Sequence, residues 1–184
     1  MKYGTYTNTR NSAWQCLIDC NISELPIKPV KIAKLYNLQC KKADNKVLHG
    51  DAGKIKKING VATIIFNSEN IPQRQRYTIM HELGHFVLGH LGNEPLSRSE
   101  SDCRPEEEQA ADKFAINMLA PACVLWGLNL HTPEEIAKVC DISMQAATYR
   151  AERMKILYKR NKFFTESIER DVYKQFEDFI KNNR

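Results

Sequence analysis

The sequence has no long apolar run and no recognisable export signal. A membrane-spanning helix needs about 18 to 20 consecutive apolar residues, whereas the most apolar stretch, residues 114–130, is interrupted by asparagine, proline and glycine. Residues 1–7 lack the apolar core of a secretory signal peptide. We therefore expect a cytoplasmic protein that does not enter a membrane.

Cysteine spacing of the kind found in structural zinc sites is also absent. None of the six cysteines stands in a C-x2-C pair, which is the usual ligand spacing of such sites. In a reducing compartment these side chains should be free thiols. Cys16 and Cys20 lie on the apolar face of an expected helix, so we predict that they pack as small core residues.

The composition is that of an ordinary globular chain. Of 184 residues, 42% are hydrophobic and 27% are charged, which excludes the disordered and fibrous classes. The net charge of +5 comes from 27 basic and 22 acidic residues interleaved along the chain, so it does not by itself indicate a nucleic-acid-binding protein. The sequence has no internal repeat and no low-complexity tract.

The residue pattern predicts a mainly helical α+β fold with a small antiparallel sheet that precedes a long helix. Residues 61–66 are β-branched and aromatic, and Asn59-Gly60 before them is a two-residue hairpin signal. Short strands are expected near residues 47–48, 54–58 and 61–66, and the helix near residues 75–89.

Helix-start signals mark the second half of the chain. Pro105 and the acidic run after it suit the positive end of a helix dipole. Thr132 and Glu135 form a capping box, and Ser143 is a second cap. The predicted segments are a loop at residues 91–104 and helices at residues 105–119, 133–140, 144–159 and 165–182.

The most informative segment is the motif HELGH, which begins at residue 81. On a helix, residues four apart differ by about 40° around the axis, so His81 and His85 project from one face and can reach one ion. Neutral imidazole nitrogen suits zinc. Glu82 lies beside the pair, where its carboxylate can take a proton from a water whose pKa the metal lowers. The motif therefore predicts the active site of a zinc-dependent peptidase.

A catalytic zinc site needs a third protein ligand, and three glutamates open the next helix. Glu106, Glu107 and Glu108 are all candidates. We favour Glu108 because Asp112 follows one helical turn later on the same face, where it can hold a histidine by a hydrogen bond. The two alanines between them would also let two helix backbones approach closely.

The other histidines and two tyrosines are less clearly connected with this site. Helix geometry rotates His90 by about 180° from the first histidine ligand, which indicates a role at the helix end or the surface. His49 and His131 are expected in loops, from which either could bind the substrate. Tyr77 and Tyr149 could stabilise an oxyanion, although packing in the core is the default expectation for both.

Two segments together resemble the ImmA/IrrE family of bacterial metallopeptidases. They are residues 74–86, which contain the metal motif, and residues 108–121, which contain the favoured third ligand. The upstream strand and residues 136–150 are similar too, so the likeness covers most of the chain. Tyr77 and Asp112 stand where the family pattern leads us to expect phenylalanine and asparagine.

The resemblance implies a gluzincin-like endopeptidase. His81, His85 and Glu108 would hold one Zn²⁺ per chain, and Glu82 would act as the base. The same ligands do not exclude Mn²⁺ or iron, although the order of affinities favours zinc. Family members that accompany mobile elements or prophages cleave a helix-turn-helix repressor, so such a protein substrate is expected. Residues 61–66 could form a sheet edge to which an extended substrate adds.

The resemblance also suggests a zincin-like domain over residues 1–122 and a helical region over residues 123–184. Within that region, residues 132–160 have the spacing of a helix-turn-helix motif and are followed by basic residues. A DNA-binding regulator is therefore a second hypothesis, although Asp141 stands in the turn where glycine is favoured. A third is a binding protein of toxin–antitoxin type with a non-catalytic metal site, which an intact Glu82 disfavours.

Overall fold

The computed structural model describes residues 3–90, 105–161 and 163–184, so the predicted loop at residues 91–104 lies outside the described residues. The predicted α+β class is confirmed, since helices dominate and the described residues form one three-stranded sheet. The elements follow in the order α1 (Tyr3–Asp19), α2 (Pro29–Leu35), β1 (Gln39–Ala43), α3 (Asn45–Leu48), β2 (Gly53–Ile58), β3 (Val61–Asn67), α4 (Pro72–Val87), α5 (Glu106–Leu119), α6 (Ala122–Gly127), α7 (Pro133–Cys140), α8 (Met144–Arg160), α9 (Ser167–Gln175) and α10 (Glu177–Asn183).

The sheet is mixed rather than antiparallel throughout, with strand order β1-β3-β2. β2 and β3 form the hairpin predicted at Asn59-Gly60, and both of these residues have the positive φ that the tight turn requires. β1 lies on the other side of β3 and runs parallel to it. β3 is therefore the central strand, and the prediction that residues 61–66 form a free edge is wrong.

Two local predictions are corrected by the structure. Residues 47–48 belong to the one-turn helix α3 rather than to a strand, because the Asp44 side chain caps that turn by accepting a hydrogen bond from Val47 N at 3.0 Å. The single tail helix predicted at residues 165–182 is divided into α9 and α10 at Phe176, whose side chain is fully buried.

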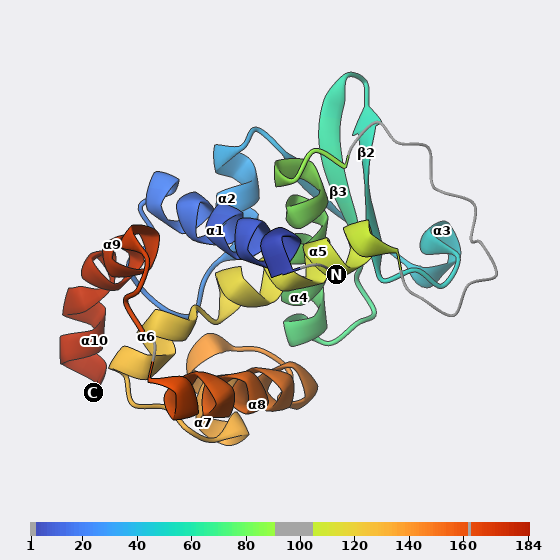
Figure 1. Ribbon diagram of the computed structural model, residues 1–184. Helices are drawn as coiled ribbons and strands as arrows, with labels where there is room; N and C mark the ends of the chain where they lie inside the picture. The colour runs from blue at the N-terminus through green and yellow to red at the C-terminus, as the bar shows by residue number, and fades with distance from the viewer. Residues whose placement is uncertain (1–2, 91–104, 162) are drawn as a thin grey trace.

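The long helices α4 and α5 cross each other next to the sheet (Figure 1). Gly84 lies at this crossing, where an added Cβ would come within 3.3 Å of Ala111 Cα and 3.1 Å of the Phe114 ring. The predicted close approach of two helix backbones thus depends on small residues from both helices. It brings the first turn of α5 over the face of α4 that carries the metal motif.

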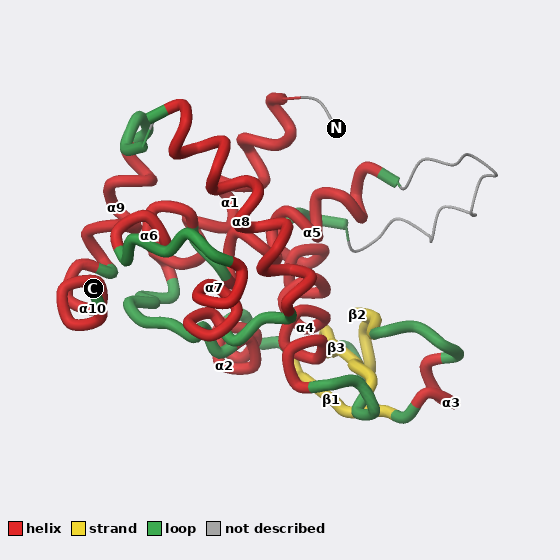
Figure 2. Tube along the Cα trace, turned by 90° about the horizontal axis from the view of Figure 1, so that it is seen from below, coloured by secondary structure: helices red, strands yellow, loops and turns green. Residues whose placement is uncertain are grey.

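The core continues from the sheet to the opposite end of the molecule, where α9 and α10 lie (Figures 1 and 2). One cluster of buried side chains includes Trp14, Met80, Phe114, Met154 and Phe176. The boundary predicted after residue 122 stays a prediction. No helix among the described residues is long and apolar enough to cross a membrane. Five cysteines in the described ranges are free thiols, namely Cys16, Cys20, Cys40, Cys123 and Cys140.

Candidate metal centre

One face of α4 presents His81 and His85 side by side. Their Nε2 atoms lie 3.1 Å apart, and their rings meet edge to face with centroids 4.8 Å apart. Both side chains are largely buried, with 12% and 14% of their surface exposed. The i, i+4 spacing therefore brings two imidazole nitrogens to one point.

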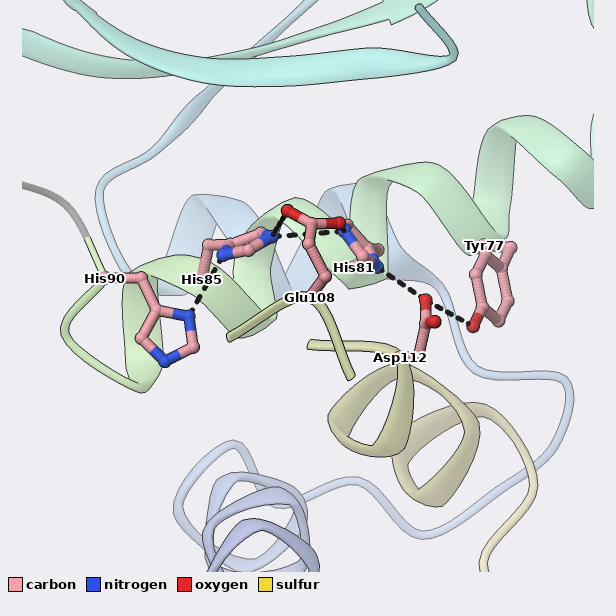
Figure 3. Close-up of polar contacts among 6 residues, drawn as sticks. All are labelled: Tyr77, His81, His85, His90, Glu108 and Asp112. Atoms are coloured by element: carbon pink, nitrogen blue, oxygen red, sulfur yellow. Dashed lines mark hydrogen bonds and ion pairs between the residues drawn. The ribbon is translucent and has the colours of Figure 1, made fainter. Parts of the chain in front are cut away.

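The third candidate ligand is a carboxylate from the first turn of α5. Figure 3 shows Glu108 facing both histidines. Its Oε2 lies 3.4 Å from Nε2 of His81, and its Oε1 lies 3.2 Å from Nε2 of His85. Within the described ranges, these three side chains are the one group of histidine, cysteine and acidic residues whose ligand atoms could hold a metal ion. Glu106 and Glu107 do not join it.

The spacing of these atoms fits zinc. A tetrahedral zinc ion with bonds of about 2.0 Å sets its ligand atoms about 3.3 Å apart, and the three closest donor distances are 3.1, 3.2 and 3.4 Å. Two imidazoles and one carboxylate also form a familiar catalytic donor set, in which a fourth position remains for water or substrate. The residues present can therefore hold the ion that the motif predicts.

Hydrogen bonds couple the ionisation of His81 and Glu108. Burial by itself would lower the pKa of His81, but hydrogen bonds with Asp112 and Glu108 raise it to about 9. Hydrogen bonds from His81 and His85 hold the pKa of Glu108 well below its ordinary value. A cation that binds here must displace a proton from His81, because a metal needs the free lone pair of the imidazole.

Asp112 lies one turn after Glu108 and contacts the outer side of the first histidine. His81 donates a hydrogen bond from Nδ1 to Asp112 Oδ1 at 2.9 Å, and the Tyr77 hydroxyl donates to the same oxygen at 3.0 Å. With Nδ1 occupied as a donor, Nε2 of His81 is the nitrogen that faces Glu108. The two departures from the family pattern, Tyr77 and Asp112, are therefore in contact, and a phenylalanine could not make this hydrogen bond.

His90 makes the matching contact to the second histidine. As expected, His90 does not join the three candidate ligands. It nevertheless faces the site. α4 ends at Val87, Gly89 adopts a φ of 77°, and the chain folds back so that His90 N–H donates to His85 O at 2.9 Å. The two Nδ1 atoms then lie 3.0 Å apart. The angle of a regular helix does not predict this contact between His85 and His90. The glycine at residue 89 was the feature of the sequence that could have indicated a reversal of the chain.

Glu82 lies beside the ligands and is itself buried, with 8% of its surface exposed. Burial raises the pKa of its carboxyl group, whereas His81, His85 and a hydrogen bond from the backbone of Ile55 act in the opposite direction. The carboxylate therefore lies between strand β2 and the face of α4 that carries His81 and His85.

These side chains open into a cleft of about 1870 Å³ that is lined by β2, α4, α5 and the first half of α8. Tyr149 of α8 lines it and is 65% exposed, so the expectation that this ring packs in the core is wrong. Tyr77 also lines the cleft and is partly buried. His49 and His131 are exposed and are not among the lining residues. His131 instead stacks on Tyr158, with ring centroids 4.6 Å apart.

Comparison with known families agrees with this geometry. The family model of the IrrE N-terminal-like domain, Peptidase M78, matches residues 33–152. The match includes the sheet, α4, α5, α7 and the cleft-lining half of α8. No curated protein matches the chain. Since the family model covers more than half of the sequence, the chain belongs to the ImmA/IrrE family of metallopeptidases.

Proposed function

We propose that this metallopeptidase is a zinc-dependent endopeptidase of the HExxH type. His81, His85 and Glu108 are its ligands, and Glu82 is its base. The observation that carries the proposal is the convergence of two Nε2 atoms and one carboxylate at 3.1 to 3.4 Å beside a buried glutamate. A purely structural metal site would have no use for that glutamate.

Glu82 and the bound metal would have different roles in hydrolysis. Zinc, when bound, polarises the peptide carbonyl and lowers the pKa of water in the site. The Glu82 carboxylate takes a proton from the attacking water and delivers it to the nitrogen of the leaving amine. Burial makes this carboxylate a stronger base, because it raises the pKa.

Two outer partners orient the ligands. Asp112 accepts the Nδ1 proton of His81, and His90 accepts the Nδ1 proton of His85, so that both Nε2 lone pairs are directed into the site. Burial and the neighbouring His85 lower the pKa of His90, which favours the neutral ring that can accept a hydrogen bond.

Strand β2 is the sheet edge that can bind the substrate. Ile55 directs its N–H to Glu82, away from β3. Main-chain groups alternate in direction along an antiparallel strand, so those of Gly53 and Lys57 share this edge with Ile55. An extended peptide can add to such an edge by main-chain hydrogen bonds, which would carry its scissile bond past Glu82.

The substrate we propose is a helix-turn-helix repressor of a mobile element or prophage. The support for this choice is the likeness of residues 74–86 and 108–121 to the ImmA/IrrE family, together with an open cleft that can take an extended segment of another protein.

Co-expression with the repressor encoded beside this gene tests the proposal. A truncated repressor should accumulate with the wild-type chain and disappear with Glu82→Gln, while metal analysis should find one zinc per chain in both proteins. An intact repressor in both cultures would contradict the proposed substrate. Cleavage that persists with Glu82→Gln would contradict the mechanism.

A further inference from the structure

Helix α8 forms a wall of the catalytic cleft. Its N-cap Ser143 lines the cleft that contains the candidate metal centre, and so do Gln145, Ala146 and Tyr149 from its first half. In a DNA-binding helix-turn-helix motif, the N-terminal residues of the second helix instead reach into the major groove. The family model matches residues up to 152, so the match also covers this half of α8.

A polar clamp holds the α7–α8 turn against the catalytic helix. Arg76 of α4 donates from Nε to Asp141 O at 3.0 Å and from Nη2 to Cys140 O at 3.3 Å and Ile27 O at 2.7 Å. Its Nε is also 3.1 Å from Asp141 Oδ2, and Gln73 donates to Asp141 Oδ1 at 2.9 Å. The start of α8 is thereby held beside the N-terminal half of α4.

This part of the cleft exposes apolar side chains among polar ones, since Arg74, Ser143 and Gln145 also line it. Ile71, just before α4, is 60% exposed, and Tyr149 is 65% exposed. Both line the cleft, as does Ile116 of α5. Ile71 precedes His81 by ten residues, which is about 15 Å along a helix axis. A peptide in extended conformation covers that distance with about four residues.

Strand β2 indicates which part of a bound peptide reaches Ile71 and Tyr149. Gly53 packs against Thr78, and Ile55 donates to Glu82, so β2 runs in the same direction as α4. A peptide added antiparallel to β2 runs in the opposite direction. Its residues on the carboxyl side of the scissile bond then extend toward Ile71 and Tyr149.

We propose that this end of the cleft is a specificity site for a large apolar side chain, and that Tyr149 and Ile71 contact it. The side chain belongs to a residue within about four positions on the carboxyl side of the cleaved bond. This inference rests on the proposed peptidase function and extends it to the class of sequence that is cut. It assigns the helix-turn-helix-like pair to the recognition of the protein substrate rather than of DNA.

Cleavage of a mixture of synthetic peptides with randomised sequence tests the specificity site. Mass spectrometry of the products of the zinc-loaded enzyme should show large apolar residues enriched on the carboxyl side of the cut. For the best peptide, Tyr149→Ala should lower kcat/KM about 10-fold, since an apolar contact of this size discriminates by about 10-fold or more. Ile156→Ala, an exposed change on the same helix outside the cleft, should leave kcat/KM unchanged.

Binding to an inactive enzyme separates this inference from the proposed function. The fluorescence anisotropy of a labelled peptide should show that Glu82→Gln binds an apolar sequence, and that adding Tyr149→Ala weakens binding about 10-fold. Equal binding with and without Tyr149→Ala, or enrichment only on the amino side of the cut, would overturn the inference while leaving the peptidase intact. So would tight, strongly salt-dependent binding to duplex DNA that Tyr149→Ala abolishes.

Discussion

The two ends of the cleft are built in opposite ways. At the metal end, His81 and His85 are largely buried, and each contacts a further polar side chain on its outer side. At the other end, Ile71 and Tyr149 expose 60% and 65% of their surface to the cleft and solvent. Chemistry needs atoms held within about 0.5 Å of a productive position, whereas an exposed ring can adapt to different side chains.

Under the proposed function, this difference predicts that activity and selectivity are separable in this protein. Changes at the metal end should affect metal binding and the rate of hydrolysis for every peptide. Changes at the apolar end should affect which peptide is cut. Substitutions at each end, and changes of pH, test that division.

Glu82→Gln should have the largest effect. We expect the rate of peptide hydrolysis to fall by about 10³-fold, because general-base catalysis contributes about 10² to 10⁴. The variant should bind zinc and peptide as the wild type does, since it keeps all three ligands and the shape of the side chain. Chromatographic assays of hydrolysis, with zinc content measured on the same samples, check this. A loss of zinc in the variant would break the assignment of Glu82 as a base that is not a ligand.

Glu108→Gln should lower zinc affinity by more than about 100-fold, which exceeds the 10- to 100-fold typical of outer partners. The neighbouring Glu107→Gln is the matched control, because Glu107 lines the cleft but does not join the ligand group. Competition with a chromophoric chelator measures both affinities. Equal losses of zinc affinity in the two variants would mean that the affinity depends on the total negative charge at the start of α5 rather than on Glu108 as a ligand.

The zinc affinity of the wild type should depend steeply on pH. His81 has a pKa of about 9 in the metal-free chain, so below that pH zinc displaces its proton, and affinity should rise about tenfold per unit as pH increases toward 9. Because the pKa of His81 is raised from its ordinary value of 6.5, protonated His81 stabilises the metal-free fold fully below pH 6.5. This stabilisation should be lost as the pH rises from 6.5 to 9. Chelator competition and urea unfolding at several pH values measure the two trends. Affinity that does not vary between pH 7 and 9 would contradict the raised pKa of His81.

His90→Ala should lower zinc affinity about 10-fold, at the lower end of the range for partners that orient a ligand. His90→Asn keeps a hydrogen-bond acceptor and should recover part of the loss. The visible spectrum of the cobalt-substituted enzyme should shift in His90→Ala, because the orientation of His85 changes. An unchanged spectrum and affinity would show that the 3.0 Å contact with His85 has no role in metal binding.

Gly84→Ala should destabilise the fold by about 1 to 3 kcal/mol, as overpacking of a close contact does. The added methyl group meets Phe114 and Ala111 at 3.1 to 3.3 Å, so α5 must shift and carry Glu108 with it. Urea unfolding measures the free energy. In an open helix position the same change stabilises by about 1 kcal/mol, so a gain in stability would show that the helix crossing is looser than the structure indicates.

The parts of this fold that the sequence predicts are those determined by residues close together in the chain. The helices α7 and α8 begin directly after Thr132 and Ser143, whose side chains cap them as predicted. The β2–β3 hairpin follows from Asn59-Gly60, and the convergence of residues 81, 85 and 108 was expected from helix spacing and the order of the motifs.

The parts that escaped prediction have tertiary causes. β1 contains no β-branched residue, and it is a strand because the edge of β3 is available for parallel pairing. Tyr149 was expected in the core because nothing near it in sequence reveals that Arg76, far away in the chain, holds the start of α8 beside the cleft. His90 lies near His85 because the chain reverses at Gly89, which the angle of a continuous helix does not describe.

The clamp at Arg76 has a consequence for how this protein can change over generations. Its guanidinium binds three main-chain carbonyl oxygens, which are present whatever side chains stand at residues 27, 140 and 141. These main-chain contacts do not depend on the Asp141 side chain, although that side chain adds contacts with Arg76 and Gln73, whereas Ile27 and Cys140 are buried in the core. Exposed positions such as Tyr149 can then change with little cost to the fold. The protein could therefore adapt to a changed substrate by substitution of a few exposed residues that line the cleft.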